Sequence, residues 1–407
     1  MSGPGYDMFA VTAHGLADLC AAELAGLGIA GRVETGGVAW SGSASSLYRA
    51  NLELRTASRV IARVGEFGAR GFAELERRAA KLPWQDFLSA GSEATLRVTC
   101  RKSKLYHAGA VAERVARTLA GVGVTVPDAV TGDDDDDAHS ADIRGQLIIV
   151  RFMRDVCTIS VDSSGALLHQ RGYRQALAKA PLRETIAAAM LLASGWRGDS
   201  PLIDPLCGSG TIPIEAALLA RSIAPGIARA DLTPRRFAFE SWPHFERASL
   251  DDVVRDARSR VRPARARIVA ADRDAGAVAA SRANAERAGV AADIEFRRVQ
   301  LSDLEPAAGG GHVVTNPPYG VRVGDRRNLR ELYAMLGDTI RSRRPGWEVT
   351  MLAADDALAV ATGLPLTELL ATRNGGIPVR LLTTACARTH TQADGVYQRL
   401  HNQEGTV

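Results

Sequence analysis

Apolar runs and helical patterns alternate along the chain from residue 181 onward. The runs are "PLIDP" (201–205), "RIVAAD" (267–272), "DIEFRRV" (293–299), "HVVTNP" (312–317) and "WEVTMLAA" (347–354). Helical patterns such as "AGAVAASRANAERAG" and "RNLRELYAMLGDTIRSR" lie between them. Parallel strands need a crossover connection, which is usually a helix. The alternation therefore predicts an α/β fold with a doubly wound, mostly parallel sheet.

One stretch near the end of this region departs from the alternation. In "LTELLATRNGGIPVRLLTTACA", two strand-like runs are separated by Asn374, Gly375 and Gly376. Glycine adopts the positive φ angles that tight hairpin turns require, so we predict an antiparallel hairpin that ends the sheet. A Rossmann-like, seven-stranded, mostly parallel sheet with a terminal hairpin is typical of the class I methyltransferase fold.

The first 165 residues show a different arrangement of predicted strands and helices. Residues 1–70 alternate the strand-like runs "MFAVTA" and "RVIARVGEF" with helical patterns, which predicts a small α+β unit. Residues 71–165 predict a second unit: a strand, a basic connector and an amphipathic helix, followed by two strands joined at Arg154 and Asp155. Residues 131–140 hold five consecutive aspartates and are interpreted as a solvated loop rather than a metal site. Residues 166–407 form the third predicted unit.

Composition narrows the class of protein. The chain has 407 residues and a formal net charge of +4, which is too small an excess to identify a nucleic-acid partner by itself. Its five cysteines are widely spaced and include no C-x-x-C pair, so neither a disulfide framework nor a metal site is expected. No signal-like amino terminus and no run of about 18 apolar residues occurs, which predicts a cytoplasmic protein without membrane spans.

The first candidate site is the loop in "PLIDPLCGSGTIPIEAALLA". An apolar strand ends at Asp204, a turn containing Gly208 and Gly210 follows, and a helix begins near Pro213. Such a turn brings backbone N–H groups close to a ligand, although a structural turn without a ligand is the alternative. Proline at 213 replaces the third glycine of a dinucleotide fingerprint, and the lysine of a phosphate-binding loop is missing. Cys207 has no basic partner nearby in sequence, so packing is its expected role.

Two further loops are expected at the same edge of the sheet. Asp272 ends the next strand, where a carboxylate can accept both hydrogen bonds of a ribose diol, and Asp274 is expected to cap the following helix. Ligands in open α/β sheets bind outside the carboxyl ends of the strands. We therefore expect Asp204, Asp272 and Asn316 to meet at one crevice.

The third loop is contained in "VVTNPPYGVRVG", residues 313–324. Its two prolines fix φ and restrict the residue before each of them, so the acceptors of Asn316 and Pro317 are held rigidly. These acceptors can hold both N–H groups of an exocyclic amine and direct its lone pair at an electrophilic methyl group. Tyr319 offers a face on which an extruded base can stack. A proline-rich turn with only a structural role is the alternative.

The combined motifs carry a resemblance that covers nearly the whole chain. "LLHQRGYRQALAKAPLRETIAAAMLLASGW" (167–196), "DPLCGSGTIPIEAA" and "VVTNPPYGVRVG" together resemble the THUMP-domain RNA guanine-N2 methyltransferases. "RKSKLYHAGAVAER" (101–114) is similar to the THUMP region of that family, and "RRFAFESWPHF" (235–245) to its insertion between the first two sheet strands. The resemblance implies a ferredoxin-like subdomain at 1–70, a THUMP RNA-binding domain at 71–165 and a catalytic domain at 166–407.

The resemblance also implies a methyl donor and its contacts. The donor is S-adenosylmethionine. The implied cofactor contacts are Pro181, Asp204, Cys207, Gly208, Ser209, Gly210, Thr211, Asp272 and Asn316. The implied contacts to the target amine are Asn316, Pro317, Pro318 and Tyr319. Gln300 stands where the family often has an aspartate facing the adenine amino group, and either Gln300 or Asp303 could accept that hydrogen bond.

Two basic clusters are candidate phosphate contacts, because phosphates dominate nucleic-acid affinity. The first consists of Arg97, Arg101, Lys102 and Lys104, and the second of Arg171, Arg174, Lys179 and Arg183. A solvated face is the alternative for each. An N-terminal THUMP unit implies that structured RNA docks there.

The leading functional hypothesis is methyl transfer to guanine N2 in structured RNA, with 23S rRNA as first candidate and tRNA as second. The partners expected are RNA and S-adenosylmethionine, with no metal and no membrane, and the chain is expected to be a monomer. Adenine-N6 methylation of DNA or RNA, cytosine-N4 methylation of DNA and methylation of a protein glutamine would use the same Asn-Pro-Pro-Tyr loop. A catalytically inactive RNA-binding protein is the alternative from another class.

Overall fold

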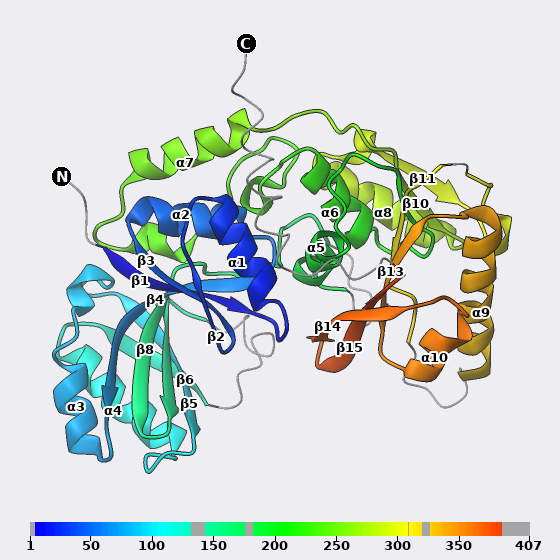
Figure 1. Ribbon diagram of the computed structural model, residues 1–407. Coiled ribbons are helices and arrows are strands. Elements are labelled where there is room, and N and C mark those ends of the chain that lie inside the picture. Colours follow the sequence, from blue (N-terminus) through cyan, green and yellow to red (C-terminus); the bar gives the residue numbers. More distant parts are fainter. Residues whose placement is uncertain (1–4, 132–142, 176–181, 308, 320–325, 385–407) are drawn as a thin grey trace.

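The computed structural model describes residues 5–131, 143–175, 182–307, 309–319 and 326–384. These residues build two sheets that lie in separate halves of the molecule (Figure 1). The amino-terminal half holds an eight-stranded mixed sheet, and the carboxyl-terminal half holds a seven-stranded sheet. The acidic run lies outside the described residues, apart from Thr131 at the end of a strand.

The amino-terminal half contains eight strands and four α-helices. They are β1 (Tyr6–Thr12), α1 (Ala17–Gly26), β2 (Arg32–Glu34), β3 (Gly37–Gly42), α2 (Ala44–Glu53), β4 (Ala57–Gly68), α3 (Phe72–Ala79), β5 (Glu93–Arg101), α4 (Ala108–Ala120), β6 (Thr125–Thr131), β7 (Gln146–Met153) and β8 (Val156–Asp162).

Both predicted amino-terminal units contribute to the same sheet, whose strand order is β2-β3-β1-β4-β8-β7-β5-β6. Antiparallel pairing of β4 with β8 joins them, and these long strands run side by side in Figure 1. The predicted joint between β7 and β8 is a turn at Arg154 and Asp155, which have φ angles of 52° and 63°. Apolar side chains of alternate strand residues, such as Ile159 and Val161 of β8, belong to the same core as the helices.

The carboxyl-terminal half alternates strands and helices as the sequence predicts. Its elements are α5 (Glu184–Ala193), β9 (Leu202–Asp204), α6 (Thr211–Ala220), α7 (Arg247–Ser259), β10 (Ile268–Asp272), α8 (Ala275–Arg287), β11 (Ile294–Arg298), β12 (His312–Thr315), α9 (Arg326–Arg343), β13 (Glu348–Ala353), α10 (Asp356–Ala361), β14 (Thr367–Asn374) and β15 (Ile377–Thr383).

The seven-stranded sheet has the order β11-β10-β9-β12-β13-β15-β14. Strands β9 to β13 pair in parallel, whereas β15 pairs antiparallel with β13 and β14. Successive residues of a strand face opposite sides, so Ile268 and Val269 of β10 belong to different apolar clusters, one containing Ile212 of α6 and the other Leu336 of α9. Helices therefore cover both faces, as the α/β prediction required.

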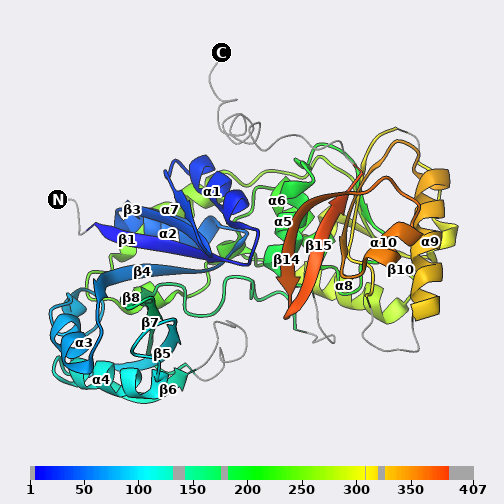
Figure 2. The ribbon, with the colours of Figure 1, turned by 60° about the horizontal axis from the view of Figure 1, so that its bottom comes forward.

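The terminal hairpin is confirmed. Asn374 of β14 pairs with Ile377 of β15, and the two residues of the turn, Gly375 and Gly376, have φ angles of 54° and 81°. These left-handed angles suit glycine and match the twist of a two-residue hairpin. The hairpin lies on the side of the seven-stranded sheet that faces α1 (Figure 2).

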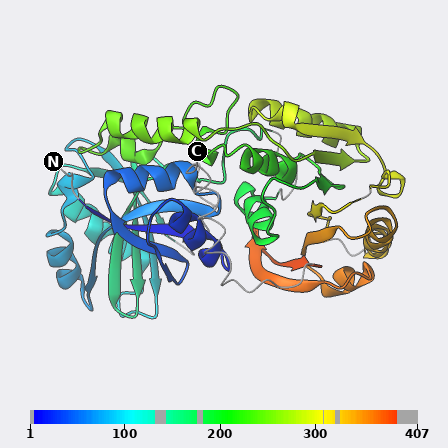
Figure 3. The same ribbon diagram turned by 45° about the horizontal axis from the view of Figure 1, so that its top comes forward.

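The insertion between β9 and β10 joins the halves. Its helix α7 packs along α2 (Figure 3). Phe239 of the insertion stacks on Tyr48 of α2 with ring centroids 4.5 Å apart. The indole N–H of Trp242 donates to the Gln146 side chain of β7 over 3.0 Å. The insertion thus fixes the two sheets relative to each other. Over the described ranges, no helix is long and apolar enough to cross a membrane.

Candidate active site

The carboxyl end of β9 is held by a buried aspartate. Asp204 is 2% exposed, and its Oδ1 accepts hydrogen bonds from the Thr315 hydroxyl (2.7 Å) and from Leu206 N (3.2 Å). Burial raises the pKa of its carboxyl group from the ordinary 3.8 to about 7, and nearby Asp272 adds to the rise. The hydrogen bond from Thr315 to Asp204 therefore connects the end of β9 to the end of β12 beneath the loop. Direct contact of Asp204 with a cofactor stays a prediction.

Glycine is required at two positions of the loop for different structural reasons. Gly208 has a φ of 50°, and its N–H donates to Asp272 Oδ2 over 3.0 Å. Gly210 has a φ of 84° and immediately precedes α6. A Cβ atom at Gly210 would lie 2.1 Å from Ser281 Oγ of α8. Gly208 thus turns the chain toward Asp272, whereas Gly210 allows α6 to pack closely on α8.

Asp272 stands at the carboxyl end of β10 as predicted. Besides Gly208 N, its carboxylate accepts a hydrogen bond from Asp274 N over 2.9 Å. Asp274 caps α8 by accepting from Gly276 N over 2.9 Å, which confirms its predicted role. A carboxylate has about four lone-pair positions, so Asp272 retains acceptor capacity for a ribose diol.

Two residues of α8 that the sequence patterns did not single out support the same loop. The side chain of Asn284 donates to Ser209 O over 2.9 Å and is itself bonded by Arg287. Arg287 also donates to Tyr173 O over 2.7 Å, in the segment that leads into the catalytic domain. The available signal was Asn284, a polar residue on the face of "SRANAER" that packs inward, where buried polar groups are usually hydrogen-bonded.

Cys207 is packed rather than reactive. Its backbone N–H donates to Ala271 O over 2.9 Å, and its side chain is buried. Burial raises the pKa of its thiol well above the ordinary range, and Asp204 and Asp272 raise it further. A neutral, buried thiol is a poor nucleophile.

The Asn-Pro-Pro-Tyr loop directly follows β12. The Oδ1 atom of Asn316 is buried and has no hydrogen-bond partner among the described residues. Pro317 is buried, Pro318 is exposed, and Tyr319 is partly buried. The Tyr319 hydroxyl accepts a hydrogen bond from Asn374 Nδ2 over 2.8 Å. A buried acceptor without a donor is costly, so the geometry fits a ligand that brings an N–H group to Asn316.

The structure says less about the remaining predicted cofactor contacts. Thr211 is the buried first residue of α6, and Pro181 lies outside the described residues. Gln300 and Asp303 flank one 3-10 turn after β11, and both are exposed. The turn is closed by a hydrogen bond from Asp303 N to Gln300 O of 3.0 Å. Both side chains can therefore face an adenine, and the choice between them stays open.

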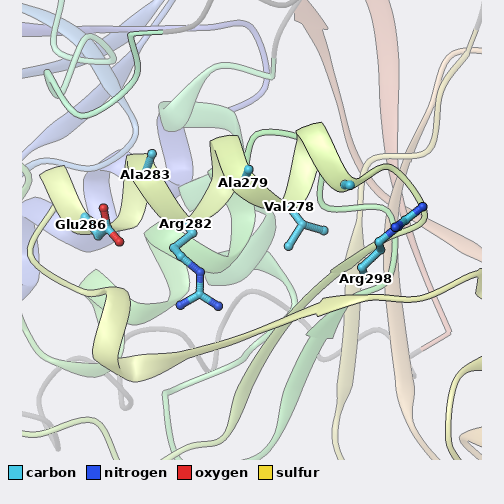
Figure 4. A pocket seen from close by; sticks show the side chains of 7 residues that line it. Val278, Ala279, Arg282, Ala283, Glu286 and Arg298 are labelled. Carbon is cyan, nitrogen blue, oxygen red and sulfur yellow. The ribbon is translucent and has the colours of Figure 1, made fainter.

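A surface hollow of about 430 Å³ runs along α8 (Figure 4). Small side chains of α8 line it, together with Arg282, Glu286 and Arg298. The guanidinium of Arg282 lies 4.7 Å from the ring centre of Phe296. None of the described site residues lines this hollow. Its lining residues Ala275 and Arg298 lie close to Asp272, the first three residues later in the chain and the second as the pairing partner of Asp272 on β11. Within the described ranges, no group of three or more His, Cys, Asp or Glu side chains could hold a metal ion.

Two arginines proposed for RNA contact are corrected by the structure. Arg171 is 2% exposed and donates to Leu168 O and Arg55 O, each over 2.6 Å. Its guanidinium also lies 3.5 Å from Glu215. Arg97, on the internal strand β5, is 6% exposed. Neither side chain can reach a phosphate, because both are packed inside the fold.

The other basic residues differ in their exposure. Arg174 is mostly buried and pairs with Glu184 over 2.6 Å, so it has a structural partner. Arg101, Lys102 and Lys104 are exposed, whereas Leu105 of the same connector is buried. Lys179 lies outside the described residues. The basic residues of the sequence therefore identified an exposed connector after β5. Arg97 within β5 and the distant Arg171 are buried instead.

Comparison with known proteins places these features in a family. Residues 171–382 match a family model described as "RMKL-like, methyltransferase domain", and residues 7–61 match the "RlmL ferredoxin-like domain". The chain belongs to this family. S-adenosylmethionine is the methyl donor of the family, so the predicted fold and cofactor are confirmed.

Two curated relatives illustrate the match. The ribosomal RNA large subunit methyltransferase K/L of Syntrophotalea carbinolica is 36% identical over 92% of this chain and 53% of its own length. The putative RNA methyltransferase slr0064 of Synechocystis sp. is 33% identical over 92% of this chain and 95% of its own length. The chain thus spans about half the length of the K/L relative.

Two solved structures share the whole architecture. One, from Listeria monocytogenes, is named a predicted N6-adenine-specific DNA methylase; it is 32% identical, with a TM-score of 0.79, covering 94% of this chain and 97% of that one. The other is a putative methyltransferase, SMU.472, complexed with SAH; it is 28% identical, with a TM-score of 0.80, covering 95% and 100%.

Proposed function

We propose that this protein transfers a methyl group from S-adenosylmethionine to the N2 amine of a guanine in structured RNA, with 23S rRNA as the first candidate. The buried acceptor at Asn316, which has no hydrogen-bond partner among the described residues, carries the proposal. It lies in the same loop as the Tyr319 ring and at the sheet edge where Asp272 and Gly208 meet. The names of the K/L and Synechocystis relatives support RNA as the substrate class.

The chain's own groups act by holding the target amine. When bound, S-adenosylmethionine supplies an electrophilic methyl group on a sulfonium. The exocyclic amine of guanine is a weak nucleophile, because its lone pair is delocalised into the ring. Hydrogen bonds to Asn316 Oδ1 and the Pro317 carbonyl would hold its two N–H groups and turn the lone pair toward the methyl carbon. The new N–C bond forms as the S–C bond breaks, and the nitrogen then loses one proton to solvent.

The cofactor loop supplies binding rather than chemistry. Asp272 is held by two backbone N–H groups and would accept the ribose hydroxyls with its remaining lone pairs. The loop is fixed from behind by Asn284 and by Asp204. These hydrogen bonds come from the protein itself and fix the shape of the loop, which lowers the cost of ordering it around a cofactor.

RNA docking is assigned to the tip of the eight-stranded sheet formed by the connector 102–107 and the turn between β7 and β8. Lys102 is exposed there, Lys104 lies in the same connector, and Tyr106 is 79% exposed. Met153 and Val156, on either side of the turn, are also exposed. Positively charged side chains can contact RNA phosphates, and the apolar side chains between them can contact unpaired bases.

Hydrogen bonds between backbone N–H groups and side-chain oxygens within the tip hold it in place. Asp155 Oδ1 accepts from Lys104 N over 2.7 Å, and Asp155 N donates to Ser103 Oγ over 3.0 Å. Leu105 is buried, and His107 caps α4 by accepting from Ala110 N. The tip lies at the start of β8, whereas the end of β8 leads toward the catalytic half. Such a surface could bind one part of an RNA while another part reaches Asn316.

Nucleoside analysis tests the proposed reaction. The purified protein and S-adenosylmethionine are incubated with rRNA and tRNA from a strain in which the gene is deleted, and with DNA. Mass spectrometry of the nucleosides is expected to show N2-methylguanosine in large-subunit rRNA. Methylation confined to tRNA would move the proposal to that substrate, and methylation only of adenine would replace it.

Adenine-N6 methylation is the second candidate function, because the Listeria relative of known structure is named for that activity. The same nucleoside profile separates it from the first. Calorimetric titration with S-adenosylmethionine tests the inactive alternative, for which we would expect no binding. A cytoplasmic location and a monomeric state complete the proposal, since rRNA is made and modified in the cytoplasm of bacteria.

A further inference from the structure

A buried amide at the terminal hairpin contacts the ring proposed to stack on the target base. Asn374, the last residue of β14, is 1% exposed. Its Nδ2 donates to the Tyr319 hydroxyl over 2.8 Å, and its Oδ1 accepts from Arg183 N over 3.4 Å. One side chain therefore connects the hairpin, the Asn-Pro-Pro-Tyr loop and the start of α5.

The hairpin itself does not require an amide at this position. The positive φ angles of the turn belong to Gly375 and Gly376, and Asn374 pairs with Ile377 as an ordinary strand residue. A buried amide is stabilising only when it is hydrogen-bonded, and here the bond from Arg183 N is long at 3.4 Å, whereas the bond to the Tyr319 hydroxyl is 2.8 Å. Its bond to Tyr319 gives the amide a reason to be there.

The hairpin is also a firm base for such a contact. β15 pairs with β13 in the catalytic sheet. On the other side, a Cβ atom at Gly15 would lie 2.2 Å from Ala371 O of β14, so the loop after β1 touches the hairpin directly. Asn374 thus connects Tyr319 to a strand that contacts both halves of the protein.

We propose that Asn374 is a positioning residue that fixes the Tyr319 ring, so that a stacked base presents its amine to Asn316. This inference rests on the proposed function, in which Tyr319 stacks on the extruded base. Without the tether, the ring would sample other orientations, and the amine would be misplaced in a larger share of complexes. Cofactor affinity should stay near wild type, because Asn374 contacts neither Asp272 nor the loop of Gly208, to which the proposal assigns cofactor binding.

A double-mutant cycle tests this role. Asn374→Leu, Tyr319→Phe and the double variant are compared in single-turnover methyl transfer, with saturating S-adenosylmethionine and rRNA from the deletion strain. Loss of one neutral hydrogen bond should slow each single variant by roughly two- to twelvefold. The double variant should be no slower than the slower single variant, since both remove the same contact.

The matched control is Thr372→Val, two residues earlier on β14. The Thr372 hydroxyl is buried and has no hydrogen-bond partner in the described part of the chain, so its removal should leave the rate near that of wild type. Calorimetry should give wild-type cofactor affinity for every variant. If Asn374→Leu does not fold, Asn374→Ser replaces it in the cycle.

The possible outcomes are distinct. If Asn374→Leu slows the Tyr319→Phe enzyme by the same factor as it slows wild type, Asn374 does not act through Tyr319 and the inference fails. An unchanged rate in Asn374→Leu also overturns it. If the wild-type protein forms no N2-methylguanosine at all, the proposed function fails instead.

Discussion

The loops that follow β9 and β12 meet at one edge of the same sheet but differ in how their polar groups are satisfied. At the first, Asp204 at the end of β9 accepts hydrogen bonds from Leu206 and Thr315. Asp272, at the end of neighbouring β10, accepts from Gly208 of this loop and from Asp274. In the second, the buried Oδ1 of Asn316 has no partner among the described residues. A pre-bonded loop is suited to holding a ligand, and an unpaired acceptor to acting on one. Changes in the first loop should therefore alter binding, and changes in the second should alter rate.

The largest effect is expected for Asn316→Ala. Loss of one preorganised polar contact to the reacting group typically lowers kcat by about 10²–10³. Cofactor affinity should stay close to wild type, since the ribose contact is assigned to Asp272. Single-turnover methyl transfer and calorimetry measure the two quantities. A variant that transfers methyl at the wild-type rate would remove the proposed role of the loop.

Asp272→Ala should weaken cofactor binding more than it slows methyl transfer. The ribose diol would lose a charged acceptor, and each such hydrogen bond contributes about 1.5–3 kcal/mol, so the Kd for S-adenosylmethionine should rise at least about tenfold. Asp272→Asn is the matched control, because it retains one oxygen that can keep a backbone bond to the loop. Equal cofactor affinity in wild type and a folded Asp272→Ala protein would refute the ribose assignment.

Gly210→Ala should lower stability as well as cofactor affinity, because Gly210 belongs to the first loop and also packs against α8. The new Cβ atom would meet Ser281 Oγ at 2.1 Å, and the backbone has a φ of 84°. Overpacking of this kind costs about 1–3 kcal/mol of unfolding free energy. Gly28→Ala is the control, since Gly28 has a similar φ of 75° but nothing within 4 Å of a Cβ atom. Urea denaturation should show the larger loss at Gly210, and equal losses would mean that backbone strain alone is responsible.

The sequence predicted the catalytic half well because its signals are local. Each apolar run, glycine turn and helix start in 201–354 depends on residues close in the chain, and so does the hairpin turn at Gly375 and Gly376. The contacts that support the site join distant residues: Thr315 with Asp204, Asn284 with Ser209, and Asn374 with Tyr319. No periodicity in one sequence reports such pairs.

The amino-terminal half was harder for the same reason. Its two predicted units share one sheet through pairing of β4 with β8, which lie far apart in the chain. The three-residue strand β2 has little apolar signal, and its residues are partly or fully exposed. Arg97 and Arg171 were misassigned because charge in a sequence does not reveal direction; here the side chains point into the fold.

The smallest effect is expected for Asp204→Asn, which tests the buried partner of the first loop. Burial raises the pKa of Asp204 from 3.8 to about 7, so the folded protein binds this proton more tightly than the unfolded chain does. Stability from this group is therefore complete below about pH 4 and is lost as pH rises toward 7, after which it is constant.

Asparagine can keep the bonds from Thr315 and Leu206 through its Oδ1 but does not titrate. Between pH 5 and pH 8, the urea midpoint should fall more for wild type than for the variant, while all other groups titrate equally in both. The same change in both proteins would mean that Asp204 is ionised in the fold at pH 5, and the buried carboxyl would then need a cationic neighbour that the described contacts do not include.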